Sequence, residues 1–389
     1  MAERTRVRIK GDLLRWAMIR SGLTDEELER RFPQFVEWEA ETRGPTLRQL
    51  EQFASVTRTP LGYLFLESPP EERLPIRHFR TIRDEPVERP SPDLLETVQA
   101  MQRRQTWMRE FLIEEKEVPL PFVGSVTINT EIGETAEGIR NVLGLRTGWA
   151  QRYNWWREAF AALRDSTDQA GILVIKNGVV GNNTHRKLDV DEFRGFVLVD
   201  EYAPLVFING ADFEGAQMFT LAHELAHVWL GTSSAFNLLD LQPFDEEQEK
   251  YCNKVAAEFL VPERELRAAW QEADEAGGDP FAFLSRRFKV SSIVVARRAL
   301  DLGFISRDRF FEFLRRYRDE QEERLRERRE SRQPGGNFYN TQNVRIGKRF
   351  AAAVYHAAKD GRILYRDAFR LTGLYGNTFD NYFRRLGMA

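Results

Sequence analysis

The chain has 389 residues, of which 42% are hydrophobic and 12% aromatic, so it can build the apolar cores that disordered and collagen-like chains lack. At roughly 100–200 residues per domain, this length predicts two to four domains. The single cysteine, Cys252, excludes an internal disulfide and fits a reducing compartment. No uncharged apolar run approaches the ~18 residues of a membrane span, and no apolar signal segment opens the chain. These features predict a soluble cytoplasmic protein without a membrane partner.

The net charge of −3 conceals two parts of opposite charge. From Arg286 to the end the chain carries 24 Lys and Arg against 12 Asp and Glu, whereas the part before Arg286 is acidic. The basic third is a candidate for binding an acidic partner such as DNA. A solvated helix face explains the same pattern equally well.

Residues 1–68 predict short helices separated by tight turns. Gly22 ends the first helix, Thr24 and Glu27 form a capping box for the next, and a Gly44-Pro45-Thr46 break precedes a third amphipathic helix. Short helices with tight turns indicate a helix-turn-helix domain. Residues 1–70 carry 11 basic and 11 acidic side chains, so this domain has little charge with which to hold phosphates. Recognition of a protein, or inhibition of the rest of the chain, is the alternative role.

A Pro-rich linker over 69–92 precedes the central region, which we assign to a domain over 93–280. A long helix is predicted at 93–115. Short runs of Val, Ile, Leu and Phe then predict three strands, and two helices follow. Their predicted bounds are 171–175, 193–199 and 205–208 for the strands, and 213–230 and 246–260 for the helices.

The C-terminal part is predicted to be helical throughout. A helical pair at 281–287 and 291–302 and a charged helix at 307–332 form an extension over 281–333. The Pro334-Gly335-Gly336 break then separates a small basic domain over 334–389. The whole chain is therefore predicted to be α+β and predominantly helical, with one small β-sheet.

The chemistry is carried by His223-Glu224-Leu225-Ala226-His227 in the helix over 213–230. Residues i and i+4 lie on one helix face, so both imidazoles can bind one metal ion while Glu224 reaches a metal-bound water. A chance match has a probability of roughly 1 in 100 in a chain of this composition. Unpaired imidazoles would also be costly in so apolar a helix.

A third ligand is expected, because catalytic zinc sites combine three protein ligands with an open water position. Glu249 begins an inward stripe on the helix over 246–260, and Asn253 follows one turn later. We predict that Glu249 binds the metal and that Asn253 hydrogen-bonds a ligand histidine or nearby backbone. Glu246 and Glu247 are rival ligands in a more solvated acidic run, and Glu258 points elsewhere on the helix.

These residues predict peptide hydrolysis without a covalent intermediate. Zinc lowers the pKa of a bound water to about 7, and Glu224 takes its proton as hydroxide attacks a polarised carbonyl. Glu224 then passes the proton to the leaving amine. We expect one Zn²⁺ per chain, although Mn²⁺ or another divalent ion also suits these ligands.

Several residues have a functional and a simpler explanation. His185 is a candidate donor to the oxyanion, but a surface loop histidine is the simpler interpretation. The strand over 205–208 could pair with an extended substrate, or it is an ordinary sheet strand. His78 and His356 have no partner pattern, and Cys252 fits core packing better than metal ligation.

A resemblance to the ImmA/IrrE family of metallo-endopeptidases is carried, over about residues 170–305, by FRGFVLVDEYAPLVFINGADFEGAQMFTLAHELAHVWLG and EKYCNKVAAEFLVP. It implies a zincin-like core in which His223, His227 and Glu249 hold zinc, Glu224 acts as the base and Asn253 supports a ligand. Family sequences often have Ala at the position of Cys252, a small change. Residues 8–66 resemble the XRE-type helix-turn-helix that precedes a peptidase in some two-part bacterial regulators.

The resemblance also implies partners. Family members are cytoplasmic zinc-dependent proteases that cleave helix-turn-helix repressors, and some two-part members are encoded beside toxins such as PIN-type nucleases. The expected substrate is therefore a repressor or a neighbouring toxin or antitoxin protein, and DNA is a further partner through residues 1–68 or the basic C-terminal third. The alternative function is a transcriptional regulator or antitoxin-like binding protein whose metal site is structural or vestigial.

Overall fold

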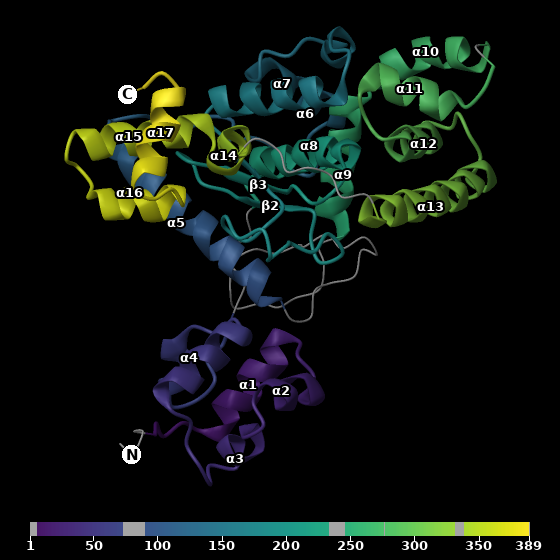
Figure 1. The fold of residues 1–389 in the computed structure, drawn as a ribbon. Coiled ribbons are helices and arrows are strands. Elements are labelled where there is room, and N and C mark those ends of the chain that lie inside the picture. Colours follow the sequence, from purple (N-terminus) through teal and green to yellow (C-terminus); the bar gives the residue numbers. More distant parts are fainter. Residues whose placement is uncertain (1–5, 73–89, 233–245, 276, 331–337, 389) are drawn as a thin grey trace. The chain divides into compact units, whose positions relative to one another are not determined.

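The computed structural model describes residues 6–72, 90–232, 246–275, 277–330 and 338–388. The chain divides into two compact units, the smaller made by residues 1–75 with 87–99 and the larger by 76–86 with 100–389. Figure 1 labels most of the helices and strands of both. Helix α5 (Pro92–Glu114) begins in the smaller unit and continues into the larger one, close to the helix predicted at 93–115.

The smaller unit is a cluster of short helices around an aromatic core. Two of the helices begin with a capping box. In each, the threonine side chain (Thr24 or Thr46) accepts a hydrogen bond from the backbone N–H three residues later (Glu27 or Gln49), and the side chain of that later residue accepts from the threonine backbone N–H. The predicted box at Thr24 is therefore confirmed, while the helix-turn-helix role remains a prediction. The helices are α1 (Gly11–Ser21), α2 (Asp25–Arg31), α3 (Phe35–Glu39), α4 (Leu47–Val56) and the 3-10 helix η1 (Leu61–Phe65). The core includes Leu14, Phe35, Trp38, Leu50 and Phe53.

The larger unit places a short sheet in the middle of a helical chain. Its described elements after α5 are α6 (Ile132–Val142), η2 (Trp149–Arg152), α7 (Trp156–Gln169), β1 (Leu173–Asn177), β2 (Gly195–Leu198), β3 (Leu205–Asn209), α8 (Glu214–Leu230), α9 (Glu246–Leu260), α10 (Glu263–Glu275), α11 (Pro280–Phe288), α12 (Ser292–Asp301), α13 (Arg307–Glu330), α14 (Phe338–Ile346), α15 (Lys348–Lys359), α16 (Tyr365–Thr372) and α17 (Asn377–Arg385). The predicted strands and helices of this region are confirmed to within a few residues.

The sheet has the strand order β1-β3-β2. Strand β1 pairs with β3 in parallel, from Leu173 opposite Leu205, and β2 pairs with β3 antiparallel, with Phe196 opposite Phe207. Because β3 is bonded on both sides, its backbone is not free to pair with an extended substrate. That interpretation of the strand over 205–208 was wrong, since sequence alone does not give strand order. Among the described residues, β2 lies at an edge of the sheet.

Helices α8 and α9 pack against each other, and α8 also packs against β2 and β3. Figure 1 shows α8 running alongside the sheet with α9 next to it. Helix α6 packs on both, so α8 is enclosed by sheet and helices. All of these elements contribute to one continuous hydrophobic core. The helix that carries both histidines therefore has almost no solvent-facing side.

The C-terminal helices belong to the larger unit. Helix α14 packs along β1, and the Arg104 guanidinium of α5 donates to the carbonyl oxygens of Leu371 at 2.8 Å and Arg345 at 2.7 Å. Lys348 pairs with Asp165 at 3.1 Å. These contacts join the segment predicted as a domain over 334–389 to the central helices and sheet, and the five-part division remains a prediction.

The structure confirms an α+β, predominantly helical chain with one three-stranded sheet. Most of the predicted linker over 69–92 and the joint at 334–336 lie outside the described residues, as does His78. In the part of the chain that is described, no helix combines the length and apolar character needed to cross a membrane.

Candidate metal centre

Helix α8 holds three of the candidate residues in an apolar environment. It ends at Gly231, whose φ of 64° is the left-handed helix cap expected from the sequence. The side chains of His223, Glu224 and His227 are buried, with exposed fractions of 2%, 7% and 5%. Because successive turns stack i and i+4 on one face, the two imidazoles lie one above the other. Their buried nitrogens therefore require polar partners.

Helix α9 brings Glu249 to these imidazoles. Glu249 is 7% exposed, whereas Glu247 on the same helix is exposed and the side chain of its rival Glu246 lies outside the described residues. The predicted inward stripe is buried at Cys252, Ala256 and Leu260. Small side chains in this stripe let the two helices approach closely, which places the carboxylate within reach of both histidines.

Three ligand atoms converge on one point. The Nε2 atoms of His223 and His227 are 3.1 Å apart. Glu249 Oε2 lies 3.1 Å from His223 Nε2, and Glu249 Oε1 lies 3.1 Å from His227 Nε2. Ligands at 2.0–2.1 Å from a tetrahedral zinc ion stand roughly 3.3 Å apart, the edge of the tetrahedron. The two nitrogens and the carboxylate thus match the donor types and spacing of a three-ligand zinc site, and this buried group could hold a metal ion.

The charges of this group are strongly coupled. Burial raises the pKa of Glu249, but its hydrogen bonds to His223 and His227 outweigh burial and hold that pKa well below its usual range. Burial disfavours the imidazolium of His227, yet Cys252 and Glu249 favour it and raise the pKa of His227 well above its usual value. Burial also raises the pKa of the Cys252 thiol, which keeps it neutral at neutral pH. Glu249 is therefore the partner that stabilises a positive charge on His227.

Glu224 lies between α8 and the edge strand β2. A Cβ atom built on Gly195, the first residue of β2, would stand 3.6 Å from Glu224 Oε1 and only 2.5 Å from Thr220 Cγ2. It would also meet the carbonyl oxygen of Phe207 at 2.8 Å. The absence of a side chain at Gly195 is what allows α8 to lie this close to the sheet. Gly195 was not singled out from the sequence, where its only signal is a glycine inside the strand predicted over 193–199.

The structure places the other candidates as follows, with Cys252 in contact with His227. Asn253 is half-buried one turn after Glu249 on α9, so its predicted support of a ligand histidine remains a prediction. His185 is exposed in a loop, where its backbone N–H donates to the Asn183 side chain at 3.0 Å. That placement favours the surface-histidine interpretation. His356 is an exposed residue of α15. Cys252 is fully buried and stands outside the three-residue group.

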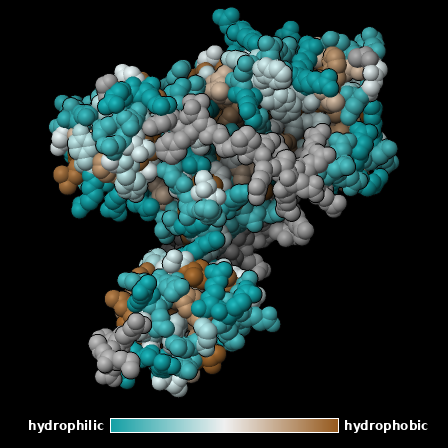
Figure 2. Space-filling view, viewed as in Figure 1, coloured by the Kyte–Doolittle hydropathy of each residue, from teal (hydrophilic) through white to brown (hydrophobic). Residues whose placement is uncertain are grey.

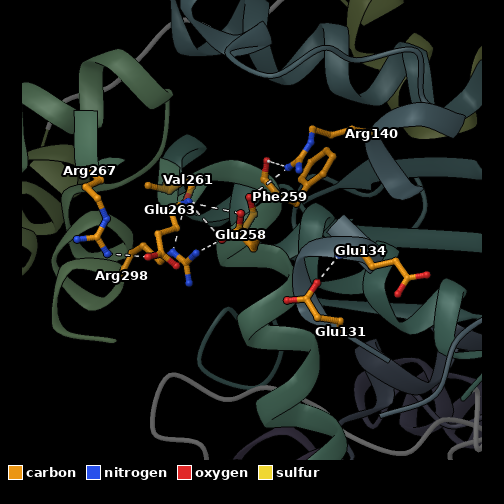
Figure 3. A network of polar contacts seen from close by, with 9 residues as sticks. All are labelled: Glu131, Glu134, Arg140, Glu258, Phe259, Val261, Glu263, Arg267 and Arg298. Atoms are coloured by element: carbon orange, nitrogen blue, oxygen red, sulfur yellow. Dashed lines mark hydrogen bonds and ion pairs between the residues drawn. The ribbon is translucent and has the colours of Figure 1, made fainter. Parts of the chain in front are cut away.

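A second buried polar network holds the C-terminal end of α9, as Figure 3 shows. Arg140 of α6 donates to the carbonyl oxygens of Glu258 at 3.2 Å and Phe259 at 3.3 Å. Arg298 of α12 donates to the carbonyl oxygen of Val261 at 3.2 Å and forms an ion pair with the Glu258 carboxylate. These contacts satisfy carbonyls that every helix end leaves open. The sequence analysis missed both arginines, although each stands in an otherwise apolar helix face.

The comparisons with known proteins fall on this same region. Residues 167–300 match the family model Peptidase_M78, described as the IrrE N-terminal-like domain, and residues 346–385 match a domain of unknown function (DUF8813). No curated protein and no solved structure matches the chain. The first match contains the sheet, α8 and α9, and so includes all three converging side chains. Residues 167–300 are therefore similar to a metallopeptidase family, which supports the resemblance of this segment to the ImmA/IrrE peptidases.

Proposed function

We propose that the protein is a zinc-dependent endopeptidase that cleaves a regulator protein, with Glu224 as the general base. The observation that carries the proposal is the convergence of His223, His227 and Glu249 at mutual distances of 3.1 Å, with Glu224 buried beside them. The match to a peptidase family over 167–300 supports the reaction class. The resemblance to ImmA/IrrE supports a repressor, or a neighbouring toxin or antitoxin protein, as substrate.

Each residue has a distinct part in this proposal. His223, His227 and Glu249 would hold the ion, and a divalent ion in such a site lowers the pKa of water and polarises a carbonyl oxygen. Glu224 accepts a proton from the attacking water as its oxygen bonds to the peptide carbon. When the C–N bond breaks, Glu224 returns that proton to the leaving amine, so no covalent enzyme intermediate forms.

Burial contributes to the same chemistry. The carboxylate of Glu224 and the two imidazoles sit among apolar side chains, where electrostatic interactions are stronger than in water. Helix α8 is fixed by the sheet on one side and by α6 and α9 on others, so the base and the two histidine ligands are held on one rigid element, against which α9 places Glu249.

The test compares the full chain with its Glu224→Gln variant. We expect the wild type to purify with about one zinc per chain and to cleave a helix-turn-helix repressor or an antitoxin encoded beside it. Glu224→Gln should keep the zinc, measured by plasma emission, while cleavage falls by about 10²–10⁴-fold because the general base is lost. Glu214→Gln, at the start of the same helix and paired with Arg157, should leave both unchanged.

Two results would count against the proposal. A wild-type chain that binds no metal, or cleavage that survives Glu224→Gln, contradicts the assigned mechanism. A chain that binds zinc tightly but cleaves none of the neighbouring proteins supports the alternative, a regulator in which the ion joins α8 to α9 and has a structural role.

A further inference from the structure

The last three helices, α15, α16 and α17, pack together around an aromatic core within the larger unit. Tyr355 of α15 stacks on Phe383 of α17 with ring centroids 4.6 Å apart, and Phe379 contacts both Phe383 at 4.6 Å and Phe369 of α16 at 5.3 Å. This core fixes α16 and α17 against α15, the three helices drawn in yellow in Figure 1. A further side chain, Tyr382, is also fully buried.

Helices α16 and α17 are joined by a turn of four residues, 373–376. Gly373 caps α16 in the left-handed conformation, with φ of 71°, and Gly376 at the end of the turn has φ of 50°. Two short helices joined by a tight Gly-containing turn are the arrangement of the helix-turn-helix motif, whose second helix enters the major groove of DNA. Here the second helix is α17.

Helix α17 divides cleanly into a buried and an outward side. Its aromatic residues are buried in the core, while its other side presents Asn377, Asn381, Arg384 and Arg385, which are exposed or half-buried. Arg384 also donates to Asn381 at 3.1 Å. Asparagine and arginine are the side chains that read adenine and guanine in the major groove. The outward side of α17 therefore has the composition of a recognition surface.

The C-terminal helices carry a net positive charge, which suits binding to a polyanion. Residues 338–389 contain nine Lys and Arg and three Asp and Glu. Several of these basic residues are engaged within the protein: Lys348 pairs with Asp165, Arg362 with Glu114 and Lys359 with Asp380, and Arg366 lies 3.6 Å from Asp367. Arg366, whose side chain is 77% exposed, and Arg370 one turn later face solvent beside α17. Figure 2 shows a largely hydrophilic surface over these helices.

The smaller unit also has short helices joined by a tight turn, at Gly22 between α1 and α2, but it lacks the positive charge. Its helix α3 has only five residues and carries Glu37 and Glu39, and Arg15 is engaged by Glu39 and Asp25. Residues 1–70 are electrically neutral overall. Affinity for DNA depends mainly on neutralising phosphates, so this unit has little with which to bind a duplex.

We propose that α16 and α17 bind double-stranded DNA, with α17 in the major groove and Arg366 and Arg370 near the phosphate backbone. The smaller unit is left for a protein partner. This inference is independent of the proposed peptidase activity, because none of its residues belongs to the metal centre and DNA binding is measured without cleavage.

The experiment measures the affinity of the full chain for a mixed-sequence duplex of about 30 base pairs by fluorescence anisotropy at several salt concentrations. Arg384→Ala with Arg385→Ala should weaken binding at least about tenfold and lower the slope of log K against log salt by roughly 1 to 2. Arg315→Ala with Arg318→Ala removes the same charge from exposed positions of α13 and should change neither quantity. Melting curves check that all variants remain folded.

Several outcomes would overturn the proposal. A wild type without duplex binding below about 10⁻⁴ M excludes it, since non-specific DNA binders reach this range. If the α17 and α13 double variants lose DNA affinity equally, the effect is one of overall charge and not of a binding surface on α17. Loss on Arg30→Ala with Arg31→Ala in α2, but not on the α17 variant, moves DNA binding to the smaller unit. Tighter binding of a single-stranded DNA or RNA of the same length assigns the surface to unpaired nucleic acid.

Discussion

The two ends of helix α9 both bury charge, and they do so in opposite ways. Near its start, the Glu249 carboxylate faces two imidazole nitrogens at 3.1 Å each, and all three groups aim at one point. At its end, Arg140 and Arg298 spread their N–H groups over separate carbonyl oxygens and the Glu258 carboxylate. The first arrangement leaves room for one common ion, whereas the second is complete without one. Convergence, rather than burial or charge alone, distinguishes the metal centre from the structural network.

The largest effect is expected from removing the converging carboxylate. Glu249→Ala should abolish zinc binding, and with it the stabilisation of ~4 kcal/mol that zinc at a thousand times its Kd gives the wild type. Melting curves with zinc and with a chelator would then coincide for the variant and differ for the wild type. Glu247→Ala, an exposed carboxylate on the same helix, should behave like the wild type. Unchanged zinc binding in Glu249→Ala would show that the start of α9 does not hold the ion, and the proposed difference between the two ends of the helix would be wrong.

A smaller effect, mainly on stability, is expected at the other end of α9. Arg298→Met removes the partner of the buried Glu258 carboxylate and of the Val261 carbonyl, which should lower the free energy of unfolding by about 2–4 kcal/mol. Its neighbour Arg297 is exposed and paired with Asp301, so Arg297→Met should change stability by less than ~0.5 kcal/mol. Denaturant unfolding measures both. Zinc stoichiometry should stay at about one per chain in each variant; a folded Arg298→Met that takes up no zinc would show that the two ends are not separable.

The smallest expected effect is a dependence of zinc affinity on pH. Cys252 and Glu249 raise the pKa of His227 well above its usual value, so a proton on His227 must leave before the imidazole can bind zinc. Below that raised pKa, the apparent affinity should fall about tenfold per pH unit for each proton displaced. Calorimetry in buffers of different ionisation enthalpy counts the protons released. Zinc binding without proton release at neutral pH would contradict the raised pKa.

In the metal-free protein, the stability contributions of His227 and Glu249 should depend on pH in opposite directions. The raised pKa of His227 stabilises the fold fully below 6.5, its usual pKa, and this contribution is lost as pH rises through the folded value. The lowered pKa of Glu249 stabilises the fold fully above 4.5 and is lost as pH falls. The ion pair therefore supports the metal-free fold best between these two values.

The helices of the candidate metal centre, and the three side chains that converge there, were predictable because their signals are local. Two histidines four residues apart in an apolar stretch, and Glu249 at the head of an inward stripe, depend only on helical periodicity. The cap at Gly231 and the bounds of α9 follow from the same periodicity and from Gly and Pro punctuation. These elements needed no knowledge of tertiary contacts.

The strand order and the roles of Arg298 and Gly195 could not be predicted, because they depend on which elements pack against each other in the folded chain. The order β1-β3-β2 leaves β3 paired on both sides, a fact of long-range pairing that its own residues do not encode. In the sequence, Arg298 does not differ from other basic residues; its role follows from the packing of α12 beside the end of α9. Gly195 is likewise explained only by the approach of Thr220 from α8.

The contacts of Arg140 and Arg298 at the end of α9 have a consequence for how this segment of the chain can vary. Glu249 and Glu258 are nine residues apart, so α9 acts as a stiff rod of roughly 14 Å between these contacts and the metal ligand. A shift of the end of α9 along the helix axis is therefore expected to move the Glu249 carboxylate as well. Substitutions on α6 and α12 can thus tune how tightly the ion is held, at a distance, while every ligand and the base keep their identity.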